Sequence, residues 1–227
     1  MNTVLITGSS KGLGAALAEV FSKNRYNIIL HGRNDDDIAD VRNLVEKNGS
    51  KVHIVSGDLL DESTINNLAE CAINNSVDIL INNAGLYLNK SFHDMSISEF
   101  KDVINVNLVA PVSITHKIFG WFKENKRGTI VNINSIAGKN GSDGELAYCS
   151  SKFGLRGFSE SLQFEATRHG IRVVDIYLGA MKTSITKDRE ENELFIEPSE
   201  AANIIFDIAK EFSTLRVNEI SLNRIKY

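Results

Sequence analysis

Short apolar runs alternate along the chain with longer segments in which apolar residues recur at the helical period. In one such segment, Leu13, Leu17 and Phe21 share one face of a predicted helix. Apolar runs separated by helices are typical of parallel strands that are buried on both faces. The pattern therefore predicts an α/β fold, a single doubly wound domain over residues 1–227 whose seven-stranded parallel sheet has helices on both faces. The expected strands are Thr3–Thr7, Asn27–Leu30, Lys51–Ser56, Val77–Asn82, Thr129–Ile133, Arg172–Tyr177 and Asn218–Leu222.

Two local signals mark where helices begin. Ser96, followed three residues later by Glu99, predicts a capping box, in which each residue satisfies the other's free backbone N–H. Pro198 suits the first turn of a helix, where its missing N–H costs nothing. Ligands of doubly wound sheets bind at the carboxyl ends of the strands. We therefore expect the functional residues directly after strands.

Composition excludes several classes of function. The chain has 227 residues, of which 42% are hydrophobic, and a net charge of -4, so it lacks the basic excess typical of nucleic-acid partners. No apolar run approaches the roughly 18 residues that a membrane span needs, so we expect no membrane partner and a cytoplasmic protein. Cys71 and Cys149 form no CxxC pair, which predicts free thiols and no metal site.

A glycine-rich turn, Thr7–Gly14, follows the first expected strand and precedes a helix. Glycines let the backbone turn tightly and approach a pyrophosphate, and the helix N-terminus adds free N–H groups and a favourable dipole. The spacing, Gly-x3-Gly-x-Gly, differs from the usual G-x-G-x-x-G fingerprint, and a plain steric turn is the alternative. The position of the turn favours a dinucleotide site in a Rossmann-type domain. Its expected cofactor-binding residues are Gly8, Ser10, Lys11, Gly12, Leu13 and Gly14.

The end of the second expected strand indicates which dinucleotide binds. An NAD site usually has an acid here, which accepts a hydrogen bond from the ribose 2′-OH, but this chain has Gly32 followed by Arg33. Arg33 can bind a 2′-phosphate with two hydrogen bonds, and Lys11 can approach the same group. We therefore predict NADP(H), with NAD(H) as the less favoured cofactor. The acids Asp35–Asp37 count against NADP(H), unless they begin the next helix, where the helix dipole stabilises negative charges.

Tyr148 and Lys152 lie four residues apart in a predicted helix, on one face. A nearby ammonium is expected to lower the pKa of the phenol, which is about 10 when unperturbed, so that Tyr148 can exchange a proton with a carbonyl or alcohol. Ser135 follows an expected strand, where its hydroxyl can hold the substrate oxygen. Asn107 is a polar residue inside an apolar helical pattern. These four are the catalytic candidates. The alternatives without a catalytic role are that Tyr148 and Lys152 only contact each other on the helix surface, and that Asn107 only bonds to the backbone.

These motifs, in this order, resemble the compact single-domain branch of the short-chain dehydrogenase/reductase family. The resemblance implies that Tyr148 is the acid/base, that Lys152 tunes it and holds the nicotinamide ribose, that Ser135 polarises the carbonyl, and that Asn107 holds a water that links Lys152 to solvent. It implies a homodimer or homotetramer. It also implies that Asn82 braces the sheet. The cofactor contacts that it implies come from Asp58, Leu59, Asn83, Ala84, Gly85, Tyr148, Lys152, Gly179 and Thr183.

The chain departs from the family pattern after the sixth expected strand. Leu178 replaces the usual proline, so the rigidity of the following loop is in question. The charged segment from Lys187 to Glu191 suggests a small or open lid over the substrate. The mostly apolar surroundings expected of the site, among them Ile136, Leu86 and Met181, suggest a carbonyl on a modest hydrophobic body.

We therefore expect an NADP(H)-dependent oxidoreductase that acts on a small carbonyl or secondary alcohol. A non-catalytic NADP(H)-binding sensor or scaffold is the alternative from another class, although such a protein could lose Tyr148, Lys152 or Ser135 without penalty. Reduction of 3-oxoacyl groups on an acyl-carrier protein stays open, with Lys139, Arg156 and Arg168 as weak docking candidates. Sugar epimerases of the extended branch need a larger C-terminal domain than 227 residues allow.

Overall fold

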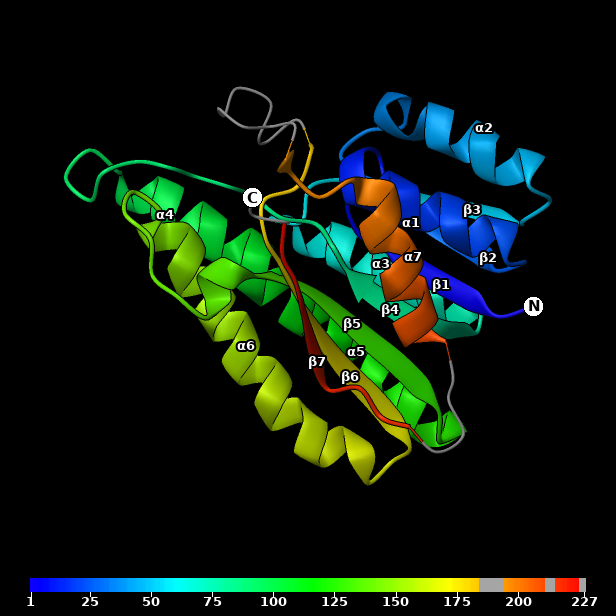
Figure 1. The fold of residues 1–227 in the computed structure, drawn as a ribbon. Helices are drawn as coiled ribbons and strands as arrows, with labels where there is room; N and C mark the ends of the chain where they lie inside the picture. Colours follow the sequence, from blue (N-terminus) through cyan, green and yellow to red (C-terminus); the bar gives the residue numbers. More distant parts are fainter. Residues whose placement is uncertain (184–193, 211–214, 225–227) are drawn as a thin grey trace.

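The computed structural model describes residues 1–183, 194–210 and 215–224. In this part of the chain, seven strands form one parallel sheet in the order β3-β2-β1-β4-β5-β6-β7 (Figure 1). The strand order reverses between β1 and β4, which opens a crevice at their carboxyl ends. The predicted doubly wound fold is thus confirmed. The strands are β1 (Thr3–Ile6), β2 (Asn27–Gly32), β3 (Val52–Ser56), β4 (Val77–Asn82), β5 (Gly128–Ser135), β6 (Ile171–Leu178) and β7 (Glu219–Leu222).

Helices cover both faces of the sheet, with a separate hydrophobic core on each. Successive residues of a strand point to opposite faces, so Val4 and Ile6 enter one core while Leu5 enters the other. The first core lies under α1, α2 and α7, and the second under α3, α5 and α6. Burial on both faces explains why the strands are continuous apolar runs. The helices are α1 (Gly12–Lys23), α2 (Ala39–Lys47), α3 (Glu62–Asn74), α4 (Ile97–Ile104), α5 (Ala110–Asn125), α6 (Leu146–Thr167) and α7 (Pro198–Ala209).

Three strands extend further than the apolar pattern predicts. β2 continues to Gly32, β5 to Ser135 and β6 to Leu178, so Ser135 ends its strand and does not follow it. The pairing of β5 with β6 includes Asn134 opposite Tyr177, although the expected strand ended one residue earlier, at Ile133. Strand pairing uses the backbone, so it tolerates polar side chains wherever these find hydrogen-bond partners.

Both predicted helix starts are confirmed. The Ser96 side chain accepts from the Glu99 N–H at 3.2 Å, and Glu99 accepts from the Ser96 N–H at 2.8 Å. Pro198 lies in the first turn of α7. Among the described residues, every helix is too short or not apolar enough to cross a membrane.

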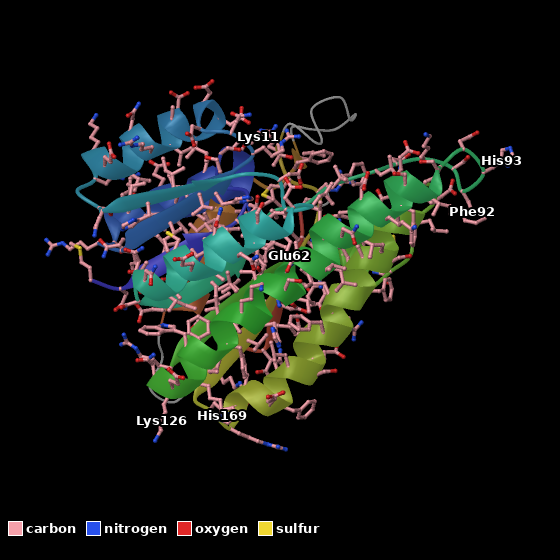
Figure 2. All side chains as sticks on the ribbon, turned by 180° about the vertical axis from the view of Figure 1, so that it is seen from behind. Lys11, Glu62, Phe92, His93, Lys126 and His169 are labelled. Atoms are coloured by element: carbon pink, nitrogen blue, oxygen red, sulfur yellow. The ribbon has the colours of Figure 1, made fainter. Side chains whose placement is uncertain are left out.

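The ligand-binding edge lies at the end of the molecule that carries Lys11. Figure 2 shows Lys11 opposite Lys126 and His169, which precede β5 and β6. All the strands are parallel, so their carboxyl ends gather at the Lys11 end. The segment from Lys187 to Glu191, expected to form a lid, lies outside the described residues.

Candidate active site

The glycine turn between β1 and α1 uses each glycine for a steric reason. Gly8 and Gly12 have φ of +65° and +56°, a region that other L residues seldom adopt. A Cβ on Gly8 would lie 2.8 Å from the Cα of Ala84. A Cβ on Gly14 would lie 2.1 Å from the carbonyl oxygen of Gly8. The turn is therefore packed against the segment that follows β4, and a side chain does not fit at Gly8 or Gly14.

The N-terminus of α1 fits a phosphate group. Lys11 is its N-cap, and within the described chain no side chain caps the free N–H groups of the first turn. Such groups, together with the positive end of the helix dipole, bind anions. The geometry fits the pyrophosphate of a dinucleotide cofactor.

Asn83 and Thr7 join the turn to the end of β4. The Asn83 amide donates to the carbonyls of Thr7 and Gly8, each at 2.9 Å. The Thr7 hydroxyl oxygen accepts from the N–H of Asn83 at 3.0 Å and of Ala84 at 3.1 Å. The Asn83 nitrogen thus holds the turn, which leaves its oxygen for the ribose contact that the resemblance implies. Asn82 instead braces the sheet, donating to Asn132 at 2.8 Å, as expected.

His31 and Ser9 belong to the site, although the sequence did not single them out. The buried imidazole of His31 accepts from the Gly8 N–H at 3.1 Å through Nδ1, and its Nε2 lies 3.2 Å from the carbonyl of Gly57. A carbonyl only accepts, so Nε2 carries the proton. Ser9 and His31 also bond to each other through side chain and backbone. The only sequence signal was a polar residue inside an apolar strand.

We expect the stability of the protein to fall in acid partly through His31. Burial lowers the pKa of His31 from 6.5. In mildly acidic solution the imidazole therefore binds a proton in the unfolded chain but stays neutral in the folded one. The free energy of unfolding therefore decreases as the pH falls below 6.5, and protonation would also break the bond to Gly8. Thermal unfolding of wild type and His31→Asn from about pH 7.5 to about pH 5.5 checks this. Wild type should lose more of its Tm than the variant, and parallel curves would contradict the role.

The end of β2 excludes an acidic ribose partner at position 32. A Cβ on Gly32 would lie 2.8 Å from Cγ1 of Ile38, so a longer side chain does not fit. Arg33 follows, exposed, and none of the ion pairs formed among the described residues includes it. Asp36 begins the short 3-10 helix that leads into α2, and Asp35 accepts from Ser56, so these acids are used locally.

Asp58 and Leu59 follow β3 as expected, but their side chains face different surroundings. The Asp58 carboxylate accepts from the N–H of Leu60 at 2.9 Å and forms a turn. Leu59 is buried in the second core beside Leu5. An adenine contact at this point therefore involves Asp58 or the backbone rather than the Leu59 side chain.

The loop after β6 is held by backbone hydrogen bonds in place of the family's proline. Leu178 is the last residue of β6 and pairs with Leu222 of β7, and the Gly179 N–H donates to Leu222 at 2.9 Å. The Lys182 N–H then donates to the Ile196 carbonyl at 2.9 Å. The next residue, Thr183, packs over the glycine turn, where its Cγ2 would lie 3.3 Å from a Cβ on Gly12.

Three of the four catalytic candidates lie together at the end of β5. Tyr148 and Lys152 lie on α6, with the Lys152 Nζ 5.7 Å from the centre of the Tyr148 ring. Ser135, at the end of β5, forms a hydrogen bond with Tyr148, and its Oγ also accepts from the Ala137 N–H at 3.1 Å. Lys152 is buried, and its ammonium donates to the Ile133 carbonyl at 2.8 Å. This group can polarise a carbonyl and exchange a proton with it.

The expected lowering of the Tyr148 pKa is wrong for this structure. Burial raises that pKa to about 12, and the hydrogen bond with Ser135 only partly opposes the rise. Burial also lowers the pKa of Lys152 to about 8, against the attraction of Asp175. The reason is that removal from water disfavours both charged forms, a cost that the helical spacing of the two residues does not reveal. Tyr148 is therefore protonated at neutral pH and is suited to donate a proton.

Asn107 lies in a π-helical turn, Asn105–Val109, between α4 and α5. Its side chain is buried and holds the segment after β4, since its Oδ1 accepts from the Leu86 N–H at 2.7 Å. Its Nδ2 donates to the Leu86 carbonyl at 2.9 Å and to Ser151 at 3.0 Å. The side chain of Asn107 thus joins α6 to the wall of the site. The water that the resemblance implies there stays a prediction.

Comparison with known proteins identifies the family. The family model of the short chain dehydrogenases matches residues 2–194. The chain therefore belongs to the short-chain dehydrogenase/reductase family of oxidoreductases, whose members bind a nicotinamide cofactor.

Individual relatives cover most of the chain. It is 31% identical, over 95% of its length and 93% of the relative's, to the 3-oxoacyl-(acyl-carrier-protein) reductase FabG of Aquifex aeolicus. It is 30% identical to the acetoacetyl-CoA reductase of Paracoccus denitrificans, over 91% of this chain and 90% of that one. A metagenomic short-chain oxidoreductase in complex with NADP superimposes with a TM-score of 0.88 and 26% identity, covering 100% of this chain and 98% of that chain.

Proposed function

We propose that this protein is an NADPH-dependent reductase of carbonyl compounds, with Tyr148 as the proton donor. The observation that carries the proposal is the group at the end of β5, where the half-buried Ser135 and Tyr148 meet the buried Lys152. A phenol that stays protonated at neutral pH is suited to reduction, which consumes a proton, more than to oxidation.

Each residue of the group has its own task. The nicotinamide, when bound, supplies the hydride that reaches the carbonyl carbon. Ser135 orients the carbonyl oxygen, and Tyr148 donates its phenolic proton to that oxygen as negative charge develops there. The phenolate left on Tyr148 is stabilised by the Lys152 ammonium, 5.7 Å from the ring centre. Release of the alcohol and proton uptake from solvent restore the phenol.

The end of β2 supports NADPH over NADH. Position 32 carries glycine, and a Cβ there would lie 2.8 Å from Cγ1 of Ile38, so this strand end has no acid that would repel a 2′-phosphate. Arg33 and Lys11 are both exposed at the same edge. A guanidinium can bind a phosphate with two parallel hydrogen bonds, which gives Arg33 the larger share of the selectivity.

Replacing Arg33 with Ala should therefore weaken NADPH binding by about 10- to 100-fold, the loss expected for about 1.4–3 kcal/mol of charge-assisted hydrogen bonding. NADH has no 2′-phosphate, so its affinity should stay within about twofold. Titration of both nucleotides by ligand fluorescence measures this. Arg42→Ala is the matched control, because that exposed guanidinium already pairs with Glu46 at 2.8 Å on α2. Equal affinities of wild type for both nucleotides would contradict the assignment.

The named relatives make 3-oxoacyl thioesters the first substrates to test. One relative is a 3-oxoacyl-(acyl-carrier-protein) reductase and another an acetoacetyl-CoA reductase. The predicted docking patch for a carrier protein is weakened, since Lys139 pairs with Glu219 at 3.0 Å and Arg156 with Glu160 at 2.7 Å. A small thioester such as acetoacetyl-CoA is therefore the better probe than an acyl carrier.

The test is NADPH consumption with acetoacetyl-CoA, ethyl acetoacetate and simple ketones as acceptors. Turnover of any of them supports the proposal. Tight NADPH binding without turnover of any carbonyl would favour the alternative, a non-catalytic sensor or scaffold. The cytoplasmic location and the homodimer or homotetramer stay predictions, of which sedimentation of the purified protein checks the second.

A further inference from the structure

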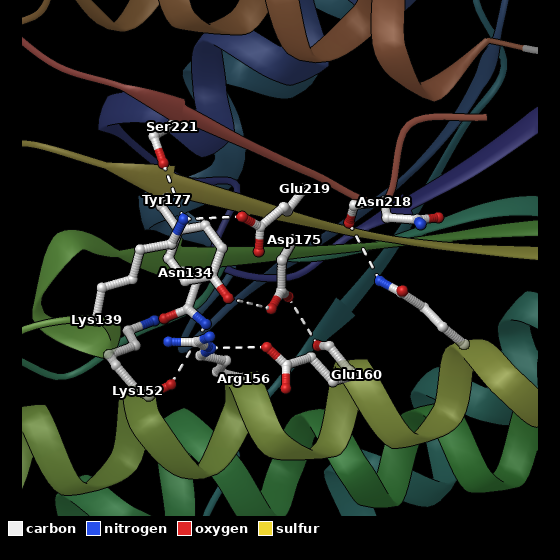
Figure 3. A network of polar contacts seen from close by, with 12 residues as sticks. Asn134, Lys139, Lys152, Arg156, Glu160, Asp175, Tyr177, Asn218, Glu219 and Ser221 are labelled. Atoms are coloured by element: carbon white, nitrogen blue, oxygen red, sulfur yellow. Dashed lines mark hydrogen bonds and ion pairs between the residues drawn. The ribbon is translucent and has the colours of Figure 1, made fainter. Parts of the chain in front are cut away.

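Strand β5 holds two of the three catalytic side chains in place. Ser135 is its last residue, and the Ile133 carbonyl accepts from the Lys152 ammonium at 2.8 Å. The Asn134 amide also donates to the Lys152 backbone carbonyl at 3.3 Å (Figure 3). Lys152 is thus bound to the strand through both its side chain and its backbone. Tyr148 lies one turn earlier, in the first turn of α6, and its ring meets a different part of the chain.

The ring of Tyr148 packs against Tyr87, in the segment that follows β4. The two rings meet edge to face, with 5.2 Å between their centres and an interplanar angle of 75°. Both side chains are half-buried. Rings in this arrangement attract each other because the positive edge of one faces the negative face of the other. The contact therefore restricts how far the Tyr148 ring can tilt.

Tyr87 is itself held at both ends. Its hydroxyl donates to the Glu145 carboxylate at 2.6 Å, a short charge-assisted hydrogen bond. One residue before it, the backbone of Leu86 is bound on both sides by Asn107, at 2.7 Å through the N–H and at 2.9 Å through the carbonyl. The backbone and the tip of the Tyr87 side chain are thus fixed to different elements.

The loop that carries Tyr87 also packs closely on the loop before α6. The Lys90 N–H donates to the Gly144 carbonyl at 2.7 Å. Gly144 has a φ of +71°, and a Cβ there would lie 3.0 Å from Oδ1 of Asn89. The next residue, Glu145, directly precedes α6. The Tyr87 ring is therefore held between the loop after β4 and the start of the catalytic helix.

We propose that Tyr87 is a positioning residue for the reduction: its ring, anchored through the hydroxyl to Glu145, keeps the Tyr148 ring in the orientation from which it donates its proton. The inference rests on the proposed function, because it assigns to Tyr87 a role in the proton transfer from Tyr148. Displacement of a reacting group by about 1 Å can cost roughly 100-fold in rate, so small changes in the tilt of the Tyr148 ring matter.

Removing the anchor should lower kcat and leave cofactor binding unchanged. Tyr87→Phe keeps the ring but loses its hydrogen bond, and Glu145→Ala removes the acceptor. Each variant should lower kcat for acetoacetyl-CoA reduction by about 5- to 20-fold, a part of the loss that full misplacement causes. The affinity for NADPH should stay within about twofold, because neither residue belongs to the glycine turn.

The double variant Tyr87→Phe/Glu145→Ala shows whether the two residues act through one hydrogen bond. If they do, each single variant already removes that bond, and the double variant should have the kcat of the single ones. The charge of Glu145 does not explain such a loss. This carboxylate raises the pKa of Tyr148, so its removal alone would make Tyr148 the stronger acid, and Tyr87→Phe leaves the charge in place.

NMR of protein with isotope-labelled tyrosine gives a readout that needs no substrate. The chain has five tyrosines, and Tyr148→Phe assigns the signal of interest. The Tyr148 ring signals should shift in Tyr87→Phe and in Glu145→Ala, because the neighbouring ring then acts on them from a changed position. Phe92→Ala is the matched control, since Phe92 lies on the same loop but is 72% exposed (Figure 2). It should leave the signals and kcat unchanged.

Unshifted Tyr148 signals in both Tyr87→Phe and Glu145→Ala would overturn the inference, as would single variants with the kcat of wild type. A double variant whose loss of kcat is the product of the two single losses would overturn it as well. Because the NMR readout needs no turnover, shifted signals without turnover of any carbonyl compound count against the proposed function alone.

Discussion

Replacing Tyr148 with Phe is expected to lower kcat for carbonyl reduction by about 10²- to 10⁴-fold, the usual contribution of a positioned general acid. The variant lacks the hydroxyl group from which Tyr148 donates the proton. The ring keeps its edge-to-face contact with Tyr87, at 5.2 Å between centres, so the fold should be retained. NADPH should bind with nearly unchanged affinity, because the glycine turn and Arg33 are untouched. Steady-state rates of NADPH oxidation and a separate NADPH titration measure the two effects.

Tyr26→Phe is the matched control for that experiment. It removes a hydroxyl from another ring that packs edge-to-face, here against Phe21 at 5.1 Å, and this half-buried ring packs against the first core. Its kcat should equal that of wild type. A Tyr148→Phe variant that keeps more than about a tenth of wild-type kcat would show that another group donates the proton.

Gly14→Ala is expected to abolish tight NADPH binding and to destabilise the fold. The new Cβ would lie 2.1 Å from the Gly8 carbonyl oxygen and 2.7 Å from the Asn83 amide nitrogen, so both the turn and its brace must move. Overpacking of this kind costs about 1–3 kcal/mol or more. Because the same turn presents the N–H groups of α1, displacement also removes the phosphate site. Urea unfolding and NADPH fluorescence titration measure the two losses.

Gly120→Ala makes the same chemical change at a harmless position. Gly120 is exposed in the middle of α5, and a Cβ there would meet no atom within 4 Å. Since alanine is the better helix former, the variant should gain about 0.5–1 kcal/mol in the free energy of unfolding. Its NADPH binding should be unchanged. If Gly14→Ala bound NADPH as tightly as Gly120→Ala does, the glycine turn would not be the cofactor site.

Local patterns predicted the fold well, because they act over a few residues. Apolar runs such as Val4–Ile6 form strands, and the two-residue alternation of their side chains fills both cores. The predicted strand ends were less accurate where polar residues continue the pairing, as at Asn134 and Ser135. Hydrophobicity indicates burial, whereas strand pairing depends on the backbone, so the two end at different residues.

Parts of the site were predictable for the same reason. The spacing of Tyr148 and Lys152 on a helix and the three glycines of the turn that leads into α1 are sequence features with direct steric meaning. His31 was not recognised as part of the site, because its partners lie elsewhere in the chain. It meets Gly8, 23 residues away, and Gly57, 26 residues away, across separate elements.

The sequence by itself determined the doubly wound fold, the glycine turn at its switch point and the helical pairing of Tyr148 with Lys152. Tertiary structure alone decided the protonation of that pair. A pKa depends on how much water a group loses and on which charges surround it, and both follow from packing between distant segments. Burial thus raises the pKa of Tyr148 where the local spacing predicted a decrease, and it lowers the pKa of Lys152 to about 8.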